Sequence, residues 1–304
     1  MSLLSLLAPA AVSAQPLSWG TLGLTPGIEL GFFTLRWYSL AYLAGILLGY
    51  WHLSKMLRAP GAPMAQRHAD DLFFYCTLGI ILGGRLGFAM FYKPELFTDF
   101  SNPGFVSWGL LRLWDGGMSF HGGVLGVLAA ITWVAMRNKL NWLRLCDYIA
   151  VNVGFGMLFG RLANFVNGEL WGRVTDVPWA MTFCDIEHTA TTCVSSFQAR
   201  HPSQLYQAAL EGLAIILIML WLFWRTNARW RPGLLVGVFT VAMGAARFIN
   251  EFFREPDSYL VSVVEQTGLS RGQWLSLPMI AVGLAVIAYS LTRRIEPKTS
   301  APVT

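Results

Sequence analysis

Long apolar segments alternate with short polar segments along almost the whole chain. A helix needs about 20 apolar residues to cross the roughly 30 Å hydrocarbon core of a bilayer. The segments that meet this requirement are residues 33–53, 72–92, 118–136, 146–167, 205–224, 233–253 and 273–291. No repeat of fixed period and no low-complexity stretch divides the chain. We therefore expect an all-α polytopic membrane protein with seven transmembrane helices, in which residues 1–304 form a single domain.

The first 32 residues are also apolar, but they lack the pattern of a crossing helix. Pro9, Pro16 and Pro26 interrupt them. The stretch "AVSAQ" is similar to a signal-peptidase cleavage site, but no basic residues precede its apolar run. We therefore expect residues 1–32 to form an N-terminal surface segment rather than a cleaved signal peptide.

The composition agrees with this pattern. Hydrophobic residues make up 55% of the chain and charged residues 13%, whereas a soluble domain has about 25% charged residues. The mean hydropathy is +0.49. The formal net charge of +5 raises the possibility of nucleic-acid binding, so the positions of the basic residues decide its meaning.

Lysine and arginine are concentrated in alternate loops. Twelve of the 22 lie on one side of the expected spans: Lys55, Arg58, Arg67, Arg137, Lys139, Arg144, Arg225, Arg229, Arg231, Arg293, Arg294 and Lys298. By the positive-inside rule, the N-terminus and the loop region 168–203 lie outside and the C-terminus is cytoplasmic. The basic loops then face anionic headgroups of the lipid bilayer, and we expect no nucleic-acid partner.

Four further arginines lie within or at the edges of the expected spans, all in the outer half of the membrane: Arg36, Arg85, Arg161 and Arg247. An arginine at the centre of a bilayer costs at least about 2.5 kcal/mol on insertion scales. We therefore expect these side chains to face the interior of the helix bundle or a wet cavity.

Two stretches combine such an arginine with a carboxylate. In "RFINEFFREPD" at 247–257, Arg247 and Glu251 lie one helical turn apart. In "GRLANFVNGELWGR" at 160–173, Glu169 follows Arg161 after the end of a span. One interpretation is structural: the ion pairs Arg247–Glu251 and Arg161–Glu169 hold helices together. The other is functional: arginines outnumber carboxylates in this half of the bilayer and bind an anion, most simply a phospholipid headgroup.

A histidine stands in the glycine-rich stretch "WDGGMSFHGG" at 114–123. His121 either bonds a loop carbonyl or acts as a base, since nearby arginines would keep its ring neutral. We expect His52 and His68 to be surface residues on the cytoplasmic side. For His201, at the entry to the fifth span, a local structural role is favoured.

The cysteines do not form a metal-binding pattern. Cys76 and Cys146 are isolated, whereas Cys184 and Cys193 share the expected periplasmic loop. In that oxidising compartment a disulfide and two unpaired thiols are about equally supported. The sequence has no nucleotide-binding or metal-binding motif, and we expect neither a cofactor nor a metal.

Several blocks together are similar to one family. They are "RWYSLAY" at 36–42, "GGRLGF" at 83–88, "WDGGMSFHGGVLG" at 114–126, "GRLANFVNGELWGR" at 160–173, "RHPSQLYQAALEG" at 200–212 and "RFINEFFREPD" at 247–257. In this combination and order the chain resembles the prolipoprotein diacylglyceryl transferases. The resemblance implies a seven-span enzyme of the bacterial inner membrane.

The resemblance also implies the substrates and the site. The diacylglyceryl group of phosphatidylglycerol moves to the lipobox cysteine in the signal peptide of a prolipoprotein, and a thioether and glycerol phosphate form. The residues matching the family's catalytic positions are His121, Arg161 and Arg247, and those expected to bind substrate, beside the two arginines, are Tyr38, Arg85, Asn164, Glu169, Gly172 and Glu251. The alternative is a membrane transporter or binding protein for an anionic lipid or solute, for which repeated halves and broken helices are typical.

Overall fold

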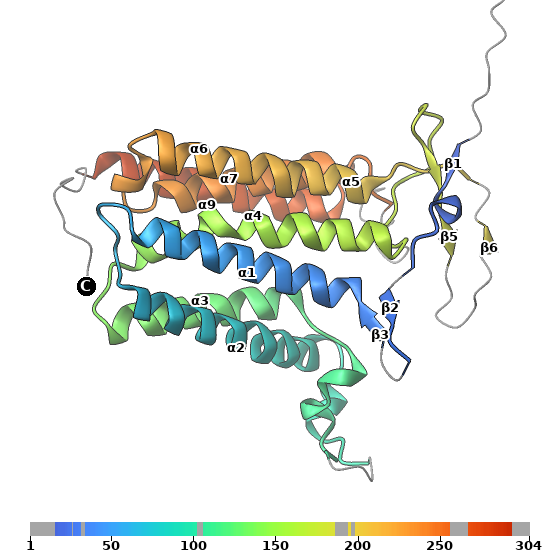
Figure 1. The fold of residues 1–304 in the computed structure, drawn as a ribbon, viewed down its shortest axis with the longest axis horizontal. Helices are drawn as coiled ribbons and strands as arrows, with labels where there is room; N and C mark the ends of the chain where they lie inside the picture. The colour runs from blue at the N-terminus through green and yellow to red at the C-terminus, as the bar shows by residue number, and fades with distance from the viewer. Residues whose placement is uncertain are drawn as a thin grey trace, which may run out of the picture.

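Long helical segments run side by side through the molecule (Figure 1). The computed structural model describes residues 16–25, 27–31, 34–101, 106–185, 194–195, 198–255 and 267–293. The long segments are α1 (Trp37–Leu57), α2 (Gln66–Phe91), α3 (Phe120–Arg137), α4 (Trp142–Val166), the continuous run of α5 (Ser203–Gln207), η6 (Ala208–Ala214) and α6 (Ile215–Arg225), α7 (Leu234–Asn250) and α9 (Arg271–Thr292). Short 3₁₀ turns connect them: η2 (Trp19–Leu22), η3 (Pro94–Phe97), η4 (Gly109–Leu111), η5 (Leu113–Asp115) and η7 (Ala228–Trp230).

Each predicted span coincides with one of these helical segments. By length and composition, 5 of them could cross a membrane: α2, α3, α4, the segment Ser203–Arg225 and α9. Helix α7 has only 17 residues, and the tryptophan, tyrosine and histidine side chains of α1 lower its hydropathy. The chain is therefore a mostly helical, multi-pass membrane protein, whereas seven crossings and their direction remain predictions.

Glycines bring α2 and α3 together so closely that their backbones touch. A Cβ atom on Gly83 would lie 2.3 Å from the carbonyl oxygen of Gly122, and one on Gly126 would lie 2.0 Å from that of Gly79. Small residues allow this approach between membrane helices, where van der Waals packing rather than apolar burial drives association. Most of the glycines around Arg85 and His121 therefore serve helix packing.

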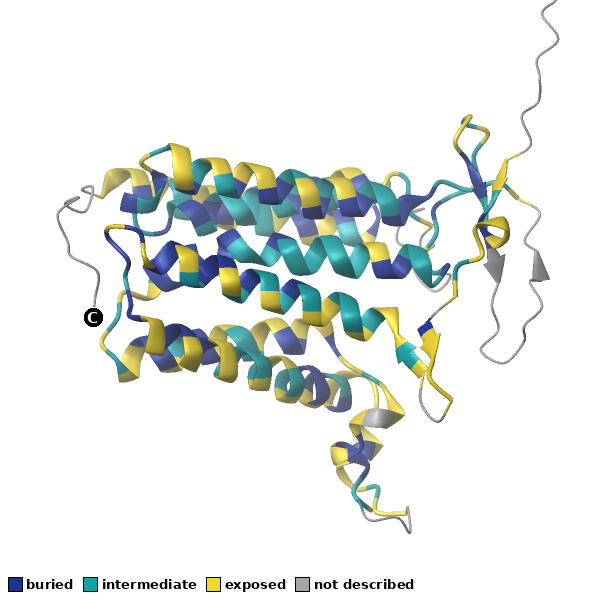
Figure 2. Cartoon of the chain, in the orientation of Figure 1, coloured by how far each residue is buried: buried dark blue, intermediate teal, exposed yellow. Residues whose placement is uncertain are grey.

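Helix α4 occupies the middle of the bundle. It packs against α1 on one side and against η6 and α7 on the other, while α7 pairs with α9. Apolar side chains on the outer surfaces of the bundle are exposed (Figure 2), for example Trp51 at 59% and Trp221 at 60%. Exposed apolar faces of this kind are expected where lipid is the solvent.

The main apolar core lies toward the end of the bundle away from the strands. Met56, Leu145, Met219 and Phe223 are each 0% exposed there. His52 is also buried, at 5%: its Nδ1 lies 2.8 Å from Asn152 Oδ1, and Trp224 Nε1 donates to its Nε2. The expectation that His52 is a surface residue was therefore wrong, because neighbouring helices cover it.

His68 is buried as well, at 5%, which also contradicts the expectation. Its Nδ1 accepts a hydrogen bond from the backbone N–H of Ala65 at the start of α2. The imidazole thus caps a helix end whose first amide groups have no intrahelical partner.

Three pairs of short strands, which the sequence analysis did not predict, lie at one end of the bundle (Figure 1). They are β1 (Leu17–Ser18) with β4 (Met181–Thr182), β2 (Gly27–Glu29) with β3 (Thr34–Arg36), and β5 (Cys184–Asp185) with β6 (Val194–Ser195). The pair β1–β4 is parallel, and the other two are antiparallel. Trp19 is 3% exposed and donates from Nε1 to the carbonyl oxygen of Phe165, which attaches the N-terminal segment to the end of α4. Cys193 lies outside the described residues, so the proposed disulfide is not tested.

Candidate active site

Two arginines from different helices meet on one buried carboxylate. Arg161 of α4 donates to Glu211 Oε2 from Nε at 3.1 Å and from Nη2 at 2.9 Å. Arg247 of α7 places Nη1 3.7 Å from Glu211 Oε1, and Asn250 Nδ2 donates to the same oxygen at 3.1 Å. The Glu211 side chain is 0% exposed, whereas those of Arg161 and Arg247 are 20% and 26% exposed. The carboxylate is therefore buried below two guanidinium groups, which remain partly accessible to solvent.

A second carboxylate, Glu251, lies on the other side of Arg247. Its Oε1 is 2.8 Å from Arg247 Nη2 and 3.4 Å from Arg254 Nη1, and its Oε2 accepts from Ser270 Oγ at 2.8 Å. A Cβ on Gly272 would lie 2.6 Å from Glu251 Oε1, so this glycine leaves room for the carboxylate at the start of α9. The predicted ion pair between Arg247 and Glu251 is confirmed.

The other predicted ion pair, Arg161 with Glu169, was wrong. Glu169 Oε1 instead accepts hydrogen bonds from Asn164 Nδ2 at 3.1 Å and Asn167 Nδ2 at 3.4 Å. The reason is the turn at Gly168, whose φ of +66° folds the chain back over the end of α4. Glu169 therefore faces the helix end, and Arg161 pairs with a residue 50 positions away.

Asn164 connects this helix end to the first helix. It is 5% exposed, and its Nδ2 also donates to the hydroxyl of Tyr38 at the start of α1. Gln204 Nε2 donates to the backbone carbonyl of Glu169 at 2.6 Å, which attaches the same turn to α5. The predicted residues Tyr38, Asn164 and Glu169 thus form one hydrogen-bonded group near Arg161.

Gly172 lies where three chain segments cross. Its N–H donates to the carbonyl of His201 at 2.9 Å, and it forms an isolated β-bridge with Arg254. A Cβ at Gly172 would lie 2.4 Å from the carbonyl oxygen of Phe253 and 2.6 Å from the Cβ of His201. Position 172 therefore requires glycine for a steric reason, because no side chain fits there. Burial lowers the pKa of His201, whose ring packs against Phe253 and Tyr206, in agreement with a local structural role.

Arg85 is held away from the arginine pair. It is 4% exposed, and its guanidinium donates to backbone carbonyls of the loop before α3: those of Gly109, Leu110, Arg112, Gly116 and Gly117. These acceptors match the five N–H groups of an arginine. The structure thus gives Arg85 a loop-anchoring role, and nothing in these contacts supports substrate binding by its side chain.

His121 lies in the first turn of α3, after the N-cap Ser119. Its side chain is exposed and contacts the ring of Phe120 edge-on, with centroids 5.8 Å apart. Among the described residues, no contact joins it to Arg161 or Arg247. The first turn of α3 lies at the strand-bearing end of the bundle, where α4 also ends (Figure 1).

Three arginines and two carboxylates form one connected group of ion pairs around Arg247. Arg161, Arg247 and Arg254 contribute three positive charges, and Glu211 and Glu251 contribute two negative charges. The carboxylate side chains are at most 6% exposed, and the three guanidiniums are at least 20% exposed. The exposed edges of the arginines can therefore accept an anion.

Sequence reasoning missed Glu211, the residue that joins the two arginines. A signal was present, because Glu211 is the only acidic residue in the apolar segment 203–225. An ionisable residue within a membrane span is by default a candidate for function. Its partner arginines lie on α4 and α7, however, and their proximity follows only from helix packing.

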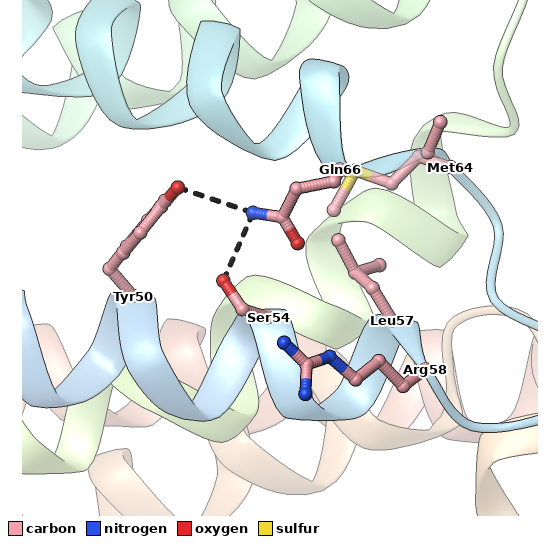
Figure 3. A pocket seen from close by; sticks show the side chains of 7 residues that line it. Tyr50, Ser54, Leu57, Arg58, Met64 and Gln66 are labelled. Carbon is pink, nitrogen blue, oxygen red and sulfur yellow. Dashed lines mark hydrogen bonds between the residues drawn. The ribbon is translucent and has the colours of Figure 1, made fainter. Parts of the chain in front are cut away.

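A separate pocket of about 700 Å³ opens between α1 and α2 (Figure 3). Gln66 Nε2 donates there to Tyr50 Oη at 3.2 Å and to Ser54 Oγ at 3.0 Å. Leu57 and Arg58 also line it. It lies at the end of the bundle away from the strands and contains none of the residues around Glu211.

Exposed arginine edges above buried carboxylates, within a bundle of apolar helices, are typical of a membrane protein that handles an anionic group. Comparison with known proteins then gives the family. The family model described as "Prolipoprotein diacylglyceryl transferase" matches residues 27–289, and the chain belongs to this family of transferases.

Similar proteins cover nearly the whole chain. The phosphatidylglycerol–prolipoprotein diacylglyceryl transferase of Erythrobacter litoralis is 61% identical over 294 residues, which are 96% of this chain and 99% of that protein. The enzymes of the same name from Zymomonas mobilis and Ruegeria pomeroyi are 44% and 47% identical, over 90% and 83% of this chain and 94% and 88% of their own lengths. The family resemblance seen in the sequence is thereby confirmed.

Proposed function

We propose that this chain transfers the diacylglyceryl group of phosphatidylglycerol to the thiol of the lipobox cysteine in a prolipoprotein signal peptide. The products are a thioether-linked prolipoprotein and glycerol phosphate. The names of the relatives support this activity over a transporter or a simple binding protein. The observation that carries the proposal is the pair Arg161 and Arg247, both paired with Glu211 and both partly exposed.

The arginine pair accounts for binding and departure of the phosphate. Arg161 uses Nε and Nη2 on Glu211, which leaves Nη1 for a phosphate oxygen. In the reaction the cysteine sulfur attacks the glyceryl carbon that carries the phosphate, the C–O bond breaks, and its electron pair leaves with the phosphate. Negative charge grows on the departing group, so fixed guanidiniums stabilise the transition state more than the bound lipid.

His121 is our candidate for the base that takes the thiol proton. A cysteine with a pKa near 8.5 is only a few per cent thiolate at pH 7, and a base in contact with it raises that fraction. The exposed position of the imidazole in the first turn of α3 supports this role, because a substrate peptide can reach it. Hydrogen bonds among Tyr38, Asn164 and Glu169 fix the end of α4, the helix that carries Arg161.

We further propose seven crossings of the bacterial inner membrane, with a periplasmic N-terminus and a cytoplasmic C-terminus. The asymmetry of basic residues supports this direction. It places the arginine pair in the periplasmic half of the bilayer, where the phosphatidylglycerol headgroup and the signal-peptide cysteine can meet.

In the same compartment Cys184 and Cys193 can form a disulfide. Mass spectrometry of non-reduced peptides from native membranes tests this pairing. Disulfide-linked peptides support it, and two free thiols refute it.

The activity is tested with purified protein in phosphatidylglycerol vesicles and a synthetic lipobox peptide. We expect the peptide to gain the mass of one diacylglyceryl group and an equal amount of glycerol phosphate to be released. A peptide with serine in place of the cysteine is the matched control and should remain unmodified. A folded protein that binds lipid but releases no glycerol phosphate and forms no thioether contradicts the proposal.

A further inference from the structure

Arg85 of α2 uses every donor of its side chain on one loop. Its guanidinium donates to five backbone carbonyls between α2 and α3: Nε to that of Leu110, Nη2 to those of Gly109 and Arg112, and Nη1 to those of Gly116 and Gly117. A guanidinium has five N–H groups, so these contacts leave none for a ligand. The loop therefore folds around this one buried side chain.

The last two of these carbonyls belong to a sharp turn just before α3. Gly116 and Gly117 have φ values of +77° and +81°, a region of backbone conformation that glycine adopts without steric cost. Nη1 of Arg85 holds the carbonyls of both. The turn leads the chain directly into Phe120, the first residue of α3.

The first turn of α3 is attached to α2 as well. The N–H of Ser119 donates to the carbonyl of Gly84 at 2.8 Å, and its Oγ accepts from the N–H of Gly122 at 3.3 Å. A Cβ on Gly87 would lie 2.9 Å from Gly122 Cα, so the backbone of Gly122 lies directly against α2. His121 stands between Ser119 and Gly122, and the backbone on both sides of it is therefore fixed to α2.

We propose that Arg85 is a positioning residue for the transfer reaction: by holding the turn before α3 it fixes the start of that helix and thereby the place of the His121 imidazole. This inference rests on the proposed function, in which His121 takes the proton of the cysteine thiol. Arg85 itself has no contact with substrate in this role. The backbone transmits its effect, since only three residues separate Gly117 from His121.

The imidazole depends on its backbone for its position. The side chain of His121 is exposed, and among the described residues its ring contacts only that of Phe120. A general base acts only within hydrogen-bond reach of the proton that it takes, about 2.6–3.2 Å between heavy atoms. A displacement of about 1 Å can lower a rate roughly 10²-fold. A residue that fixes the start of α3 therefore affects turnover without touching the reacting groups.

The first variant is Arg85→Lys, which keeps the positive charge. A lysine ammonium has three N–H donors, so at least two of the five carbonyls lose their partner. We expect kcat for thioether formation on the lipobox peptide to fall roughly 10- to 100-fold, with little change in KM for phosphatidylglycerol. If Arg85 bound the lipid instead, its loss would raise KM at unchanged kcat, and that result overturns the proposal.

The deciding measurement is a double-mutant cycle with His121→Asn. If Arg85 acts through the imidazole, Arg85→Lys should have almost no further effect on kcat once the imidazole is absent. Initial rates of the unchanged protein, the two single variants and the double variant are compared at pH 7, where a free cysteine is only a few per cent thiolate. Two losses that multiply in the double variant overturn the proposal.

Arg144→Lys is the matched control. Arg144 is also a buried arginine, at 1% exposure, and its Nη2 donates to the carbonyl of Gly61 in the loop between α1 and α2, at the other end of the bundle. Its replacement disturbs a loop in the same chemical way but far from α3. Any change that it causes in kcat should be the same with and without the His121 imidazole, and a dependence on the imidazole equal to that of Arg85→Lys overturns the proposal.

A second variant serves if Arg85→Lys does not fold. Ser119→Ala removes the hydroxyl that caps α3 but keeps the backbone bond to Gly84, so it loosens the same start of α3 with a smaller loss of stability. It then replaces Arg85→Lys in the cycle. Losses that multiply there overturn the proposal, because the start of α3 would not set the place of the imidazole.

Amide hydrogen exchange separates this proposal from the proposed function. Arg85→Lys should speed exchange in residues 116–123, and Arg144→Lys should not; unchanged exchange in folded Arg85→Lys overturns the proposal. If the unchanged protein forms no thioether, the proposed function is wrong, and exchange alone decides whether Arg85 fixes the start of α3. If the thioether forms and the losses multiply, the activity stands and the positioning role is wrong.

Discussion

Replacement of Arg161 by lysine tests whether the guanidinium acts on the phosphate as its bond breaks. Nε and Nη2 of Arg161 are occupied by Glu211, and the interactions of the described residues leave Nη1 without a partner. An arginine can therefore hold the buried carboxylate and a phosphate oxygen at once. A lysine ammonium carries its three N–H donors on one nitrogen, so it cannot reproduce both the two-point contact with Glu211 and a separate contact with the phosphate.

The size of the effect follows from the bond that is lost. A hydrogen bond to a charged group contributes about 1.5–3 kcal/mol, and each 1.36 kcal/mol of barrier changes a rate about tenfold. If the contact strengthens in the transition state, Arg161→Lys should lower kcat by roughly 10- to 150-fold. KM for phosphatidylglycerol should change much less, because the charge remains and the acyl chains still bind.

The assay measures initial rates of thioether formation over a range of phosphatidylglycerol concentrations in mixed micelles, with folding followed by thermal unfolding in the same detergent. Arg225→Lys is the matched control, since Arg225 is an exposed residue at the far end of α6. It should leave kcat and KM unchanged. A folded Arg161→Lys enzyme with unchanged kcat and a raised KM refutes the reasoning, because the arginine would then bind substrate and transition state equally.

Three further predictions concern the proton, the backbone and the direction in the membrane. His121→Asn should lose about 10²–10⁴-fold in turnover and regain part of it as the pH rises toward 9, where the peptide thiol ionises without help; a loss that does not depend on pH contradicts the base role. Gly172→Ala should lower the stability by about 2–4 kcal/mol, because its Cβ meets the carbonyl of Phe253 at 2.4 Å, and thermal unfolding in detergent checks this against Gly156→Ala, where the structure leaves open space. Single cysteines at Thr175 and Leu140 should react with a membrane-impermeant reagent in intact cells only at Thr175, and the reverse pattern overturns the proposed direction.

Local patterns in the sequence determined the features that depend on neighbouring residues. The apolar segments located the helices, because burial in lipid demands long apolar runs with all backbone groups bonded internally. The ion pair between Arg247 and Glu251 could be foreseen because residues four apart on a helix are neighbours, whatever else surrounds them. The blocks of residues shared with the family also lie within short stretches, so a linear sequence contains them completely.

The partners of the other polar groups were decided only by the tertiary structure. Arg161 pairs with Glu211 rather than with Glu169, because packing of η6 against α4 brings together residues 50 positions apart. His52 and Arg85 are buried for the same reason: other helices and a loop cover them. An ionisable group in a membrane protein must find a counter-charge or a hydrogen-bond partner. The sequence shows which groups need a partner, but only the packing of the helices decides which group becomes that partner.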